Sequence, residues 1–178
     1  SAEFALSYAT TRGIVPLMDN GHYHPTEVVS DKISALLCFN PRIALHITRG
    51  VRWDSDHVTI MDDPTMELFS EIVRCGALER VHYGLDYFDA SINRIGAYVI
   101  GSRAAQKCMT RALLEPIAKL REYEANGQGF QRLALLEEEK ALPWNAVWDM
   151  FCLKNNVPVG EDFIAEIEKY EAEVTSKR

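Results

Sequence analysis

Closely spaced cysteines are absent from this sequence. No two of Cys38, Cys75, Cys108 and Cys152 lie closer than 33 positions, so no Cys-x-x-Cys pair indicates a zinc ribbon or a dithiol redox site. Cys38, Cys108 and Cys152 lie in apolar helical patterns and are expected to be small core residues. Isolated thiols of this kind are typical of a reducing compartment, and we expect the cytoplasm.

Long apolar runs are absent as well. Runs such as residues 35–39 are far shorter than the roughly 20 residues that span a bilayer as a helix. The chain does not open with a basic segment followed by an apolar one, so no signal peptide is expected. The sequence therefore predicts no membrane partner.

Positive charge is in the minority. The 178 residues include 19 Lys and Arg against 26 Asp and Glu, which gives a net charge of −7 and a pI of about 5.2. Nucleic-acid binding needs a basic surface, so nucleic acid is not an expected partner. A small neutral or cationic ligand, or metal ions, fit this charge. The 47% hydrophobic and 25% charged residues are typical of one soluble globular domain.

Strands and helices alternate in the first half of the sequence. Short apolar runs indicate strands, and apolar residues at helical spacing indicate helices. Strands are predicted at residues 14–18, 42–47 and 80–85, with a short extra strand at 57–61, and helices at residues 25–39 and 63–75. Asp63 is predicted to cap the second helix, with Pro64 at its first position. This order is typical of parallel β/α units.

The second half of the sequence is predicted to be helical throughout. Helices are expected at residues 91–125, 129–140, 143–154 and 161–175, the last with a mostly solvated charged face. Three strands cannot close an eight-stranded barrel, which needs about 250 residues. Residues 3–9 look like the middle of a helix without a capping residue, which indicates a chain cut from something longer.

Acidic residues and histidines fall where the predicted strands end. Asp19 and His22 follow the first strand, and His46 lies near the end of the second. Asp54 and Asp56 lie in the next loop, and Asp86 ends the third strand. The carboxyl ends of barrel strands are where active sites lie in α/β barrels, so we expect these side chains to gather.

The spacing of these residues suits two metal ions. Asp19 and His22 are three positions apart across a turn, and Asp54 and Asp56 can share one side of an extended loop. Such oxygen-rich ligands suit Mn²⁺, Mg²⁺ or Co²⁺. A second set, Asp19, His46 and Asp86, could hold another ion nearby with Asp19 bridging. Two ions about 4 Å apart can polarise both oxygens of a hydroxy-carbonyl unit.

Simpler interpretations exist for each residue alone. A strand-end aspartate can cap the next helix, His46 can be a satisfied core histidine, and Asp-x-Asp can be solvated surface. The joint placement at one end of the sheet favours the metal interpretation. His24 and His57 are expected at the surface or beside the ligands, and His82 is expected to be structural. Trp53 either lines a sugar pocket or fills the barrel rim.

Six long and specific stretches then stand out. They are Gly21-His22-Tyr23-His24-Pro25-Thr26-Glu27, Ser30-Asp31-Lys32-Ile33-Ser34, Val51-Arg52-Trp53-Asp54-Ser55-Asp56-His57, Gly84-Leu85-Asp86-Tyr87-Phe88-Asp89-Ala90-Ser91-Ile92-Asn93-Arg94, Arg111-Ala112-Leu113-Leu114-Glu115-Pro116 and Leu142-Pro143-Trp144. With these stretches the sequence resembles L-rhamnose isomerases over essentially the whole chain. The resemblance implies an α/β fold. Residues 1–95 would be about three strands of a (β/α)₈ TIM barrel of the xylose-isomerase type, and residues 96–178 a helical C-terminal extension used in tetramer formation.

The resemblance also implies an activity and a ligand set. The family interconverts L-rhamnose and L-rhamnulose with divalent metal, typically Mn²⁺, with Zn²⁺, Co²⁺ or Mg²⁺ as alternatives. The positions that match its structural-metal ligands are Asp19, His46 and Asp86, and those that match its catalytic-metal ligands are His22, Asp54 and Asp56. Asp19 would touch both ions. His22, Asp54 and Asp56 would carry the chemistry, with Asp56 orienting the water that moves the hydroxyl proton.

The sequence departs from the family in its extent. The family's chain is more than twice as long, and the part absent here includes a glutamate of the structural metal site and a lysine thought to assist the chemistry. We therefore expect this chain alone to associate or to re-pack, and to be inactive. Other hypotheses are a non-catalytic metal-binding fragment or accessory subunit, an isomerase of another aldose, and a metal-dependent hydrolase or endonuclease. The acidic charge disfavours the endonuclease.

Overall fold

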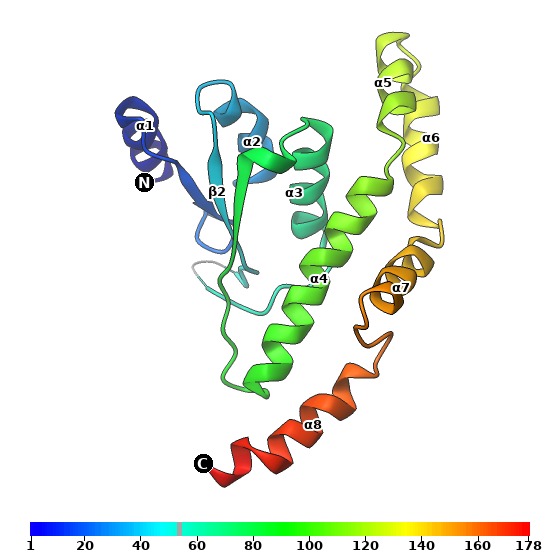
Figure 1. The fold of residues 1–178 in the computed structure, drawn as a ribbon. Helices are drawn as coiled ribbons and strands as arrows, with labels where there is room; N and C mark the ends of the chain where they lie inside the picture. The colour runs from blue at the N-terminus through cyan, green and yellow to red at the C-terminus, as the bar shows by residue number, and fades with distance from the viewer. Residues whose placement is uncertain (53–54) are drawn as a thin grey trace.

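Three parallel strands form the centre of the structure. The computed structural model describes residues 1–52 and 55–178, with strands β1 (Leu17–Asp19), β2 (Ile43–Ile47) and β3 (Val81–Leu85) in the order β1-β2-β3 (Figure 1). Both strand pairs are parallel. The α/β fold with three parallel strands is therefore confirmed.

The register of the sheet aligns the strand ends. Asp19 lies opposite His46, and His46 lies opposite Gly84. Successive side chains of a strand point to opposite faces, so neighbours in register share a face. Asp19 and His46 thus lie side by side on one face, next to a position without a side chain.

Two helices cover the other face of the sheet. They are α2 (Ser30–Leu37) and α3 (Asp63–Arg74), which link the three strands (Figure 1). Their apolar residues Ile33 and Leu68 pack with Leu45 in one buried cluster. Since burial of apolar surface is the main stabilising term, this cluster fixes the strands that carry the acidic residues.

Helix α1 (Ala2–Arg12) lies beside this core. Ser1 Oγ accepts a hydrogen bond from Phe4 N at 3.4 Å, so the prediction of a helix without a cap is wrong. Asn40 Nδ2 donates to Thr10 Oγ1 at 3.0 Å, and Leu6 packs on the core cluster. These contacts attach α1 to the end of α2.

The second half of the chain is helical, as predicted. Its helices are α4 (Arg94–Leu114), α5 (Ile117–Ala125), α6 (Gly129–Lys140), α7 (Trp144–Lys154) and α8 (Phe163–Glu173). Helix α4 packs on α3, and α7 and α8 pack on α4, whereas α5 and α6 form a hairpin at one end (Figure 1). The last helix has no buried residue, which confirms its solvated face.

Several predicted boundaries need correction. The single helix at 91–125 is wrong because Pro116, which has no N–H, separates α4 from α5. Helix α3 is capped by Asp62, whose Oδ1 accepts from Thr65 N at 3.1 Å, and not by Asp63. The extra strand at 57–61 is only an isolated antiparallel bridge between Arg49 and His57.

The first strand and the first connecting helix both begin later than predicted. Strand β1 starts after Pro16, which offers its carbonyl oxygen to Ala44 N at 2.9 Å but has no N–H of its own. Helix α2 begins at Ser30 and not near residue 25, because His24 forms a turn with Thr26 and Glu27. Short 3₁₀ turns lie at Leu78–Arg80, before β3, and at Thr175–Lys177.

The cysteines follow the prediction only in part. Cys108 and Cys152 are buried, as expected. Cys38 is exposed, so its assignment to the core is wrong; it terminates α2. None of the helices in the described residues is long and apolar enough to cross a membrane.

Candidate metal centre

The turn after β1 places the central carboxylate. Asp19 is the last residue of the strand, and its side chain is only 10% exposed. Gly21 N donates to Asp19 Oδ1 at 2.8 Å. This bond fixes the carboxylate and leaves Asp19 Oδ2 directed at two histidines. Asp19 is therefore held in place by its own turn.

A first ligand group joins this turn to the loop after β2. It consists of Asp19, His22 and Asp56, whose ligand atoms lie within 4.8 Å of one another. His22 Nε2 lies 3.8 Å from Asp19 Oδ2 and 2.9 Å from Asp56 Oδ1. Asp56 Oδ1 is buried, and within the described residues its close contact is this one with His22, which lacks hydrogen-bond geometry. A buried carboxylate oxygen that lacks a donor is unfavourable unless a cation compensates it.

A second ligand group lies across the strand ends. It consists of Asp19, His46 and Asp86, again within 4.8 Å. His46 Nδ1 lies 3.1 Å from Asp19 Oδ2 and 3.0 Å from Asp86 Oδ2. One ring N–H can donate well to only one of these oxygens, so the two carboxylates compete for a single donor. Gly84 leaves room for the ring, because a Cβ there would lie 3.0 Å from His46 Cδ2.

Asp19 Oδ2 belongs to both groups. Three carboxylates and two imidazoles therefore meet around one oxygen atom, and no Lys or Arg of residues 1–52 and 55–178 lies within 4 Å of these carboxylates. Carboxylate and imidazole ligands suit Mn²⁺, Co²⁺, Mg²⁺ and Zn²⁺. The residues present therefore fit a pair of divalent cations with Asp19 between them.

The structure brings together most of the predicted site residues. Asp19, His22, His46, Asp56 and Asp86 converge as described, whereas Asp54 and Trp53 lie outside the described residues. The other histidines play different parts. His24 bonds Thr26, His57 pairs through its backbone with Arg49, and His82 is exposed on β3.

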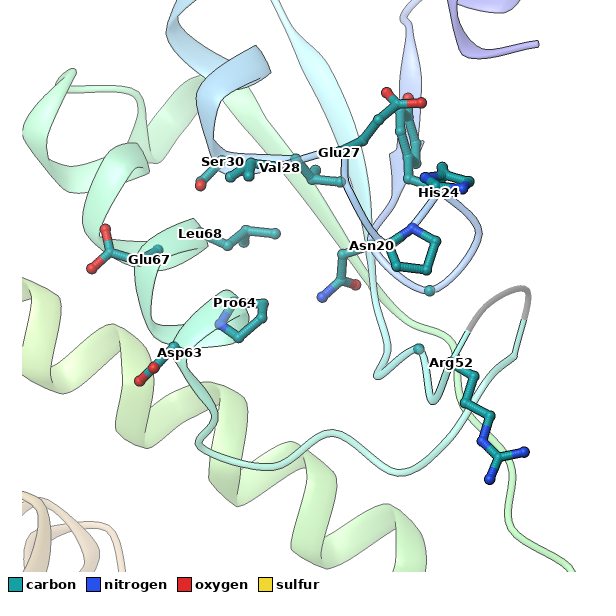
Figure 2. Close-up of a pocket in the computed structure, with 15 residues that line it drawn as sticks. Asn20, His24, Glu27, Val28, Ser30, Arg52, Asp63, Pro64, Glu67 and Leu68 are labelled. Atoms are coloured by element: carbon teal, nitrogen blue, oxygen red, sulfur yellow. The ribbon is translucent and has the colours of Figure 1, made fainter.

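A cavity of about 520 Å³ lies next to the ligand groups, between the loop after β1 and the start of α3 (Figure 2). Asn20 faces Pro64 and Leu68 across it, whereas Arg52 points away from the other labelled residues. None of the five ligand residues lines this cavity, and Gly21 lies between the two regions. The ligand groups therefore lie beside the cavity and do not form its wall.

The loop residues Asn20, Gly21 and Ser55 were not predicted as part of the site. Asn20 Oδ1 accepts from Thr48 N at 2.9 Å, and Ser55 N donates to Gly21 O at 3.2 Å. Ser55 Oγ also accepts from Val51 N at 2.8 Å. Contacts between two loops depend on how the loops pack against each other, and no local sequence pattern predicts them.

Tyr23 follows His22 in the same turn. Burial, together with the nearby charges of Glu27 and Asp19, raises the pKa of Tyr23 to about 12. Its phenol is therefore protonated at neutral pH. Tyr23 can donate a hydrogen bond there, but it cannot act as a base.

Comparison with known proteins identifies relatives over the whole chain. The model of the family L-rhamnose isomerase (RhaA) matches residues 1–178. The L-rhamnose isomerase of Bacteroides thetaiotaomicron is 84% identical over all 178 residues, and those of Citrobacter koseri and Escherichia coli O1:K1 / APEC are 54% identical. The chain spans 43% of the first relative's length and 42% of the other two. The chain belongs to the L-rhamnose isomerase family.

Proposed function

We propose that this 178-residue chain carries most of the metal site of an isomerase that interconverts L-rhamnose and L-rhamnulose. The observation that carries the proposal is the convergence of two ligand groups on Asp19 Oδ2, at the carboxyl ends of three parallel strands. Membership of the family supports the substrate. The same strand ends hold the active site in α/β barrels, so we further propose that the sheet is part of such a barrel, of the xylose-isomerase type.

Each ligand has a proposed place. Asp19, His46 and Asp86 would hold the structural ion, and His22, Asp54 and Asp56 the catalytic ion, with Asp19 touching both. Mn²⁺ is the first candidate, with Zn²⁺, Co²⁺ and Mg²⁺ as alternatives. When bound, the two ions would supply Lewis-acid polarisation of the hydroxyl and carbonyl oxygens of the open-chain sugar.

Asp56 is the proposed proton-handling residue. Its Oδ1 is buried and contacts His22 Nε2 at 2.9 Å. A carboxylate in this state can accept a hydrogen bond from water and orient it toward the sugar hydroxyl. His22 would hold the carboxylate in that orientation.

The proposal concerns a chain of the relatives' full length. These residues span 43% of the Bacteroides thetaiotaomicron relative, and the described part of each ligand group offers three ligands. We propose that residues 1–95 supply barrel strands and residues 96–178 a helical extension that supports a tetramer. This boundary falls in the first turn of α4. The free cysteines suit the cytoplasm as the compartment.

A full-length chimaera allows the test. In it, these 178 residues replace the matching 43% of the Bacteroides thetaiotaomicron relative. The chimaera should convert L-rhamnose to L-rhamnulose in the presence of Mn²⁺. Asp56→Asn should lower kcat by at least about 10²-fold, the lower range for a general acid–base group, while the ion at Asp19, His46 and Asp86 remains bound.

The matched control is Asp31→Asn, an exposed aspartate in the first turn of α2. It should leave kcat unchanged. Normal turnover by Asp56→Asn would remove the proposed role of Asp56. A chimaera that binds Mn²⁺ but converts no aldose would favour a non-catalytic metal-binding protein, and turnover of another aldose alone would reassign the substrate.

A further inference from the structure

Gly21 lies in a close contact between two backbones. In the sequence Gly21 lies between Asp19 and His22, two residues of the first ligand group. A Cβ atom on Gly21 would lie 2.5 Å from the carbonyl oxygen of Ser55 and 2.6 Å from Thr48 Cγ2. Non-bonded carbon atoms do not approach backbone oxygen this closely in packed interiors. The turn after β1 can therefore contact the loop after β2 only because position 21 has no side chain.

Gly50 extends the same contact from the opposing loop. A Cβ atom on Gly50 would lie 3.2 Å from Gly21 O and 3.3 Å from Gly21 Cα. Two hydrogen bonds run alongside, from Ser55 N to Gly21 O at 3.2 Å and from Thr48 N to Asn20 Oδ1 at 2.9 Å. We call Gly21, Gly50 and Ser55 the glycine seam.

The glycine seam sets the distance between two ligands from different loops. His22 follows Gly21 directly, and Asp56 follows Ser55 directly. Their side chains meet at 2.9 Å, between His22 Nε2 and Asp56 Oδ1. The other ligand group depends on Gly50 much less, because Asp19 and His46 are aligned by sheet hydrogen bonding and Asp86 follows β3.

We propose that Gly21 and Gly50 are positioning residues for the ion held by Asp19, His22 and Asp56. They touch neither ion nor sugar and act through the spacing of His22 and Asp56. This inference rests on the proposed metal-binding function. Residues that orient ligands from outside typically change metal affinity about 10- to 100-fold when altered.

The test compares a graded pair of substitutions in the full-length chimaera. In Gly50→Ala the loops must separate by only a few tenths of an ångström, and in Gly21→Ala by more. Titration with Mn²⁺, followed by calorimetry and by the paramagnetic resonance of the bound pair, should show two ions in the parent protein. Gly50→Ala should weaken the binding of the ion at Asp19, His22 and Asp56 about tenfold, and Gly21→Ala should abolish its binding. The affinity of the ion at Asp19, His46 and Asp86 should stay unchanged in Gly50→Ala. In Gly21→Ala it is expected to fall as well, because Gly21 N holds Asp19 Oδ1.

Gly129→Ala is the matched control. Gly129 opens α6, and a Cβ atom there meets no atom within 4 Å, so both ions should bind as in the parent protein. If Gly21→Ala does not fold, Gly50→Ala decides alone. Two outcomes in Gly50→Ala would overturn the inference and leave the proposed function intact: both ions bind with the parent affinity, or the affinity of both ions falls equally. A parent chimaera that takes up no Mn²⁺ would overturn both.

Discussion

At the scale of single residues, Glu139 is an acidic side chain in a buried position. It is 7% exposed and lies in α6, near Arg111 of α4, Glu115 just after α4, and Glu67 and Arg74 of α3. Burial raises the pKa of Glu139, and the charge of Glu115 raises it further. The folded protein therefore binds a proton more tightly here than the unfolded chain. The stability that this provides is present below about pH 4.5 and is lost as the pH rises through the folded pKa.

Replacement of Glu139 should therefore stabilise the protein at neutral pH. In the full-length chimaera, Glu139→Gln should raise the free energy of unfolding at pH 7.5, because it removes a buried charge that Glu115 repels. The gain should shrink as the pH falls toward 4.5. Urea unfolding across this range measures it, with exposed Glu138→Gln as the control. A gain that is the same at every pH would contradict the account.

At the scale of elements, a buried arginine attaches the last helices to α4. Arg103 is 7% exposed and donates to the carbonyl oxygens of Pro158 at 3.0 Å and Gly160 at 3.3 Å. Its guanidinium also lies over the rings of Trp148 and Phe163, 5.3 Å and 4.9 Å from their centroids. The link between α7 and α8 therefore depends on one side chain.

Loss of this side chain should release α8. Arg103→Met should cost at least about 2 kcal/mol, because two charge-assisted hydrogen bonds are lost and two carbonyl oxygens are left without a donor. Hydrogen exchange of the α8 amides should accelerate. Lys107→Met is the matched control, since Lys107 also lies over the Trp148 ring, at 5.9 Å, and forms no hydrogen bond within the described residues. Unchanged exchange in Arg103→Met would show that α8 is held otherwise.

The sequence predicts elements better than it predicts their ends. Hydrophobic spacing was sufficient for the three strands and for α6, since that pattern reports burial directly. It was insufficient where side-chain hydrogen bonding decides, as in the turn at His24 that delays α2, or the cap at Asp62. For the site, strand-end placement predicted that Asp19, His22, His46, Asp56 and Asp86 would come together, whereas Asp54 lies outside the described residues. The glycine seam was missed because it arises from contact between two loops.

At the scale of the whole molecule, these residues present unpaired edges and uncovered apolar side chains. In the described part of the chain, β1 and β3 each pair only with β2, so each has one free edge. Tyr83 and Leu85 of β3 are 41% and 42% exposed, and Phe130 of α6 is 78% exposed. Free strand edges and apolar patches favour association.

The 178 residues alone should therefore associate and show no isomerase activity. Sedimentation velocity over a range of concentrations should show species larger than the monomer mass of 20.2 kDa. The relatives are more than twice as long, and the additional chain is expected to cover these surfaces in the full-length protein. A monomer at all concentrations, or L-rhamnose turnover by these residues alone, would contradict this expectation.

The central claim is that two divalent ions share Asp19. Native mass spectrometry of the full-length chimaera with Mn²⁺ tests it most directly, by counting ions in the parent protein, in Asp19→Asn and in Asp86→Asn. The account predicts two ions in the parent, one in Asp86→Asn and loss of both in Asp19→Asn, since Asp19 Oδ2 belongs to both ligand groups. An Asp19→Asn variant that still binds two ions would contradict it.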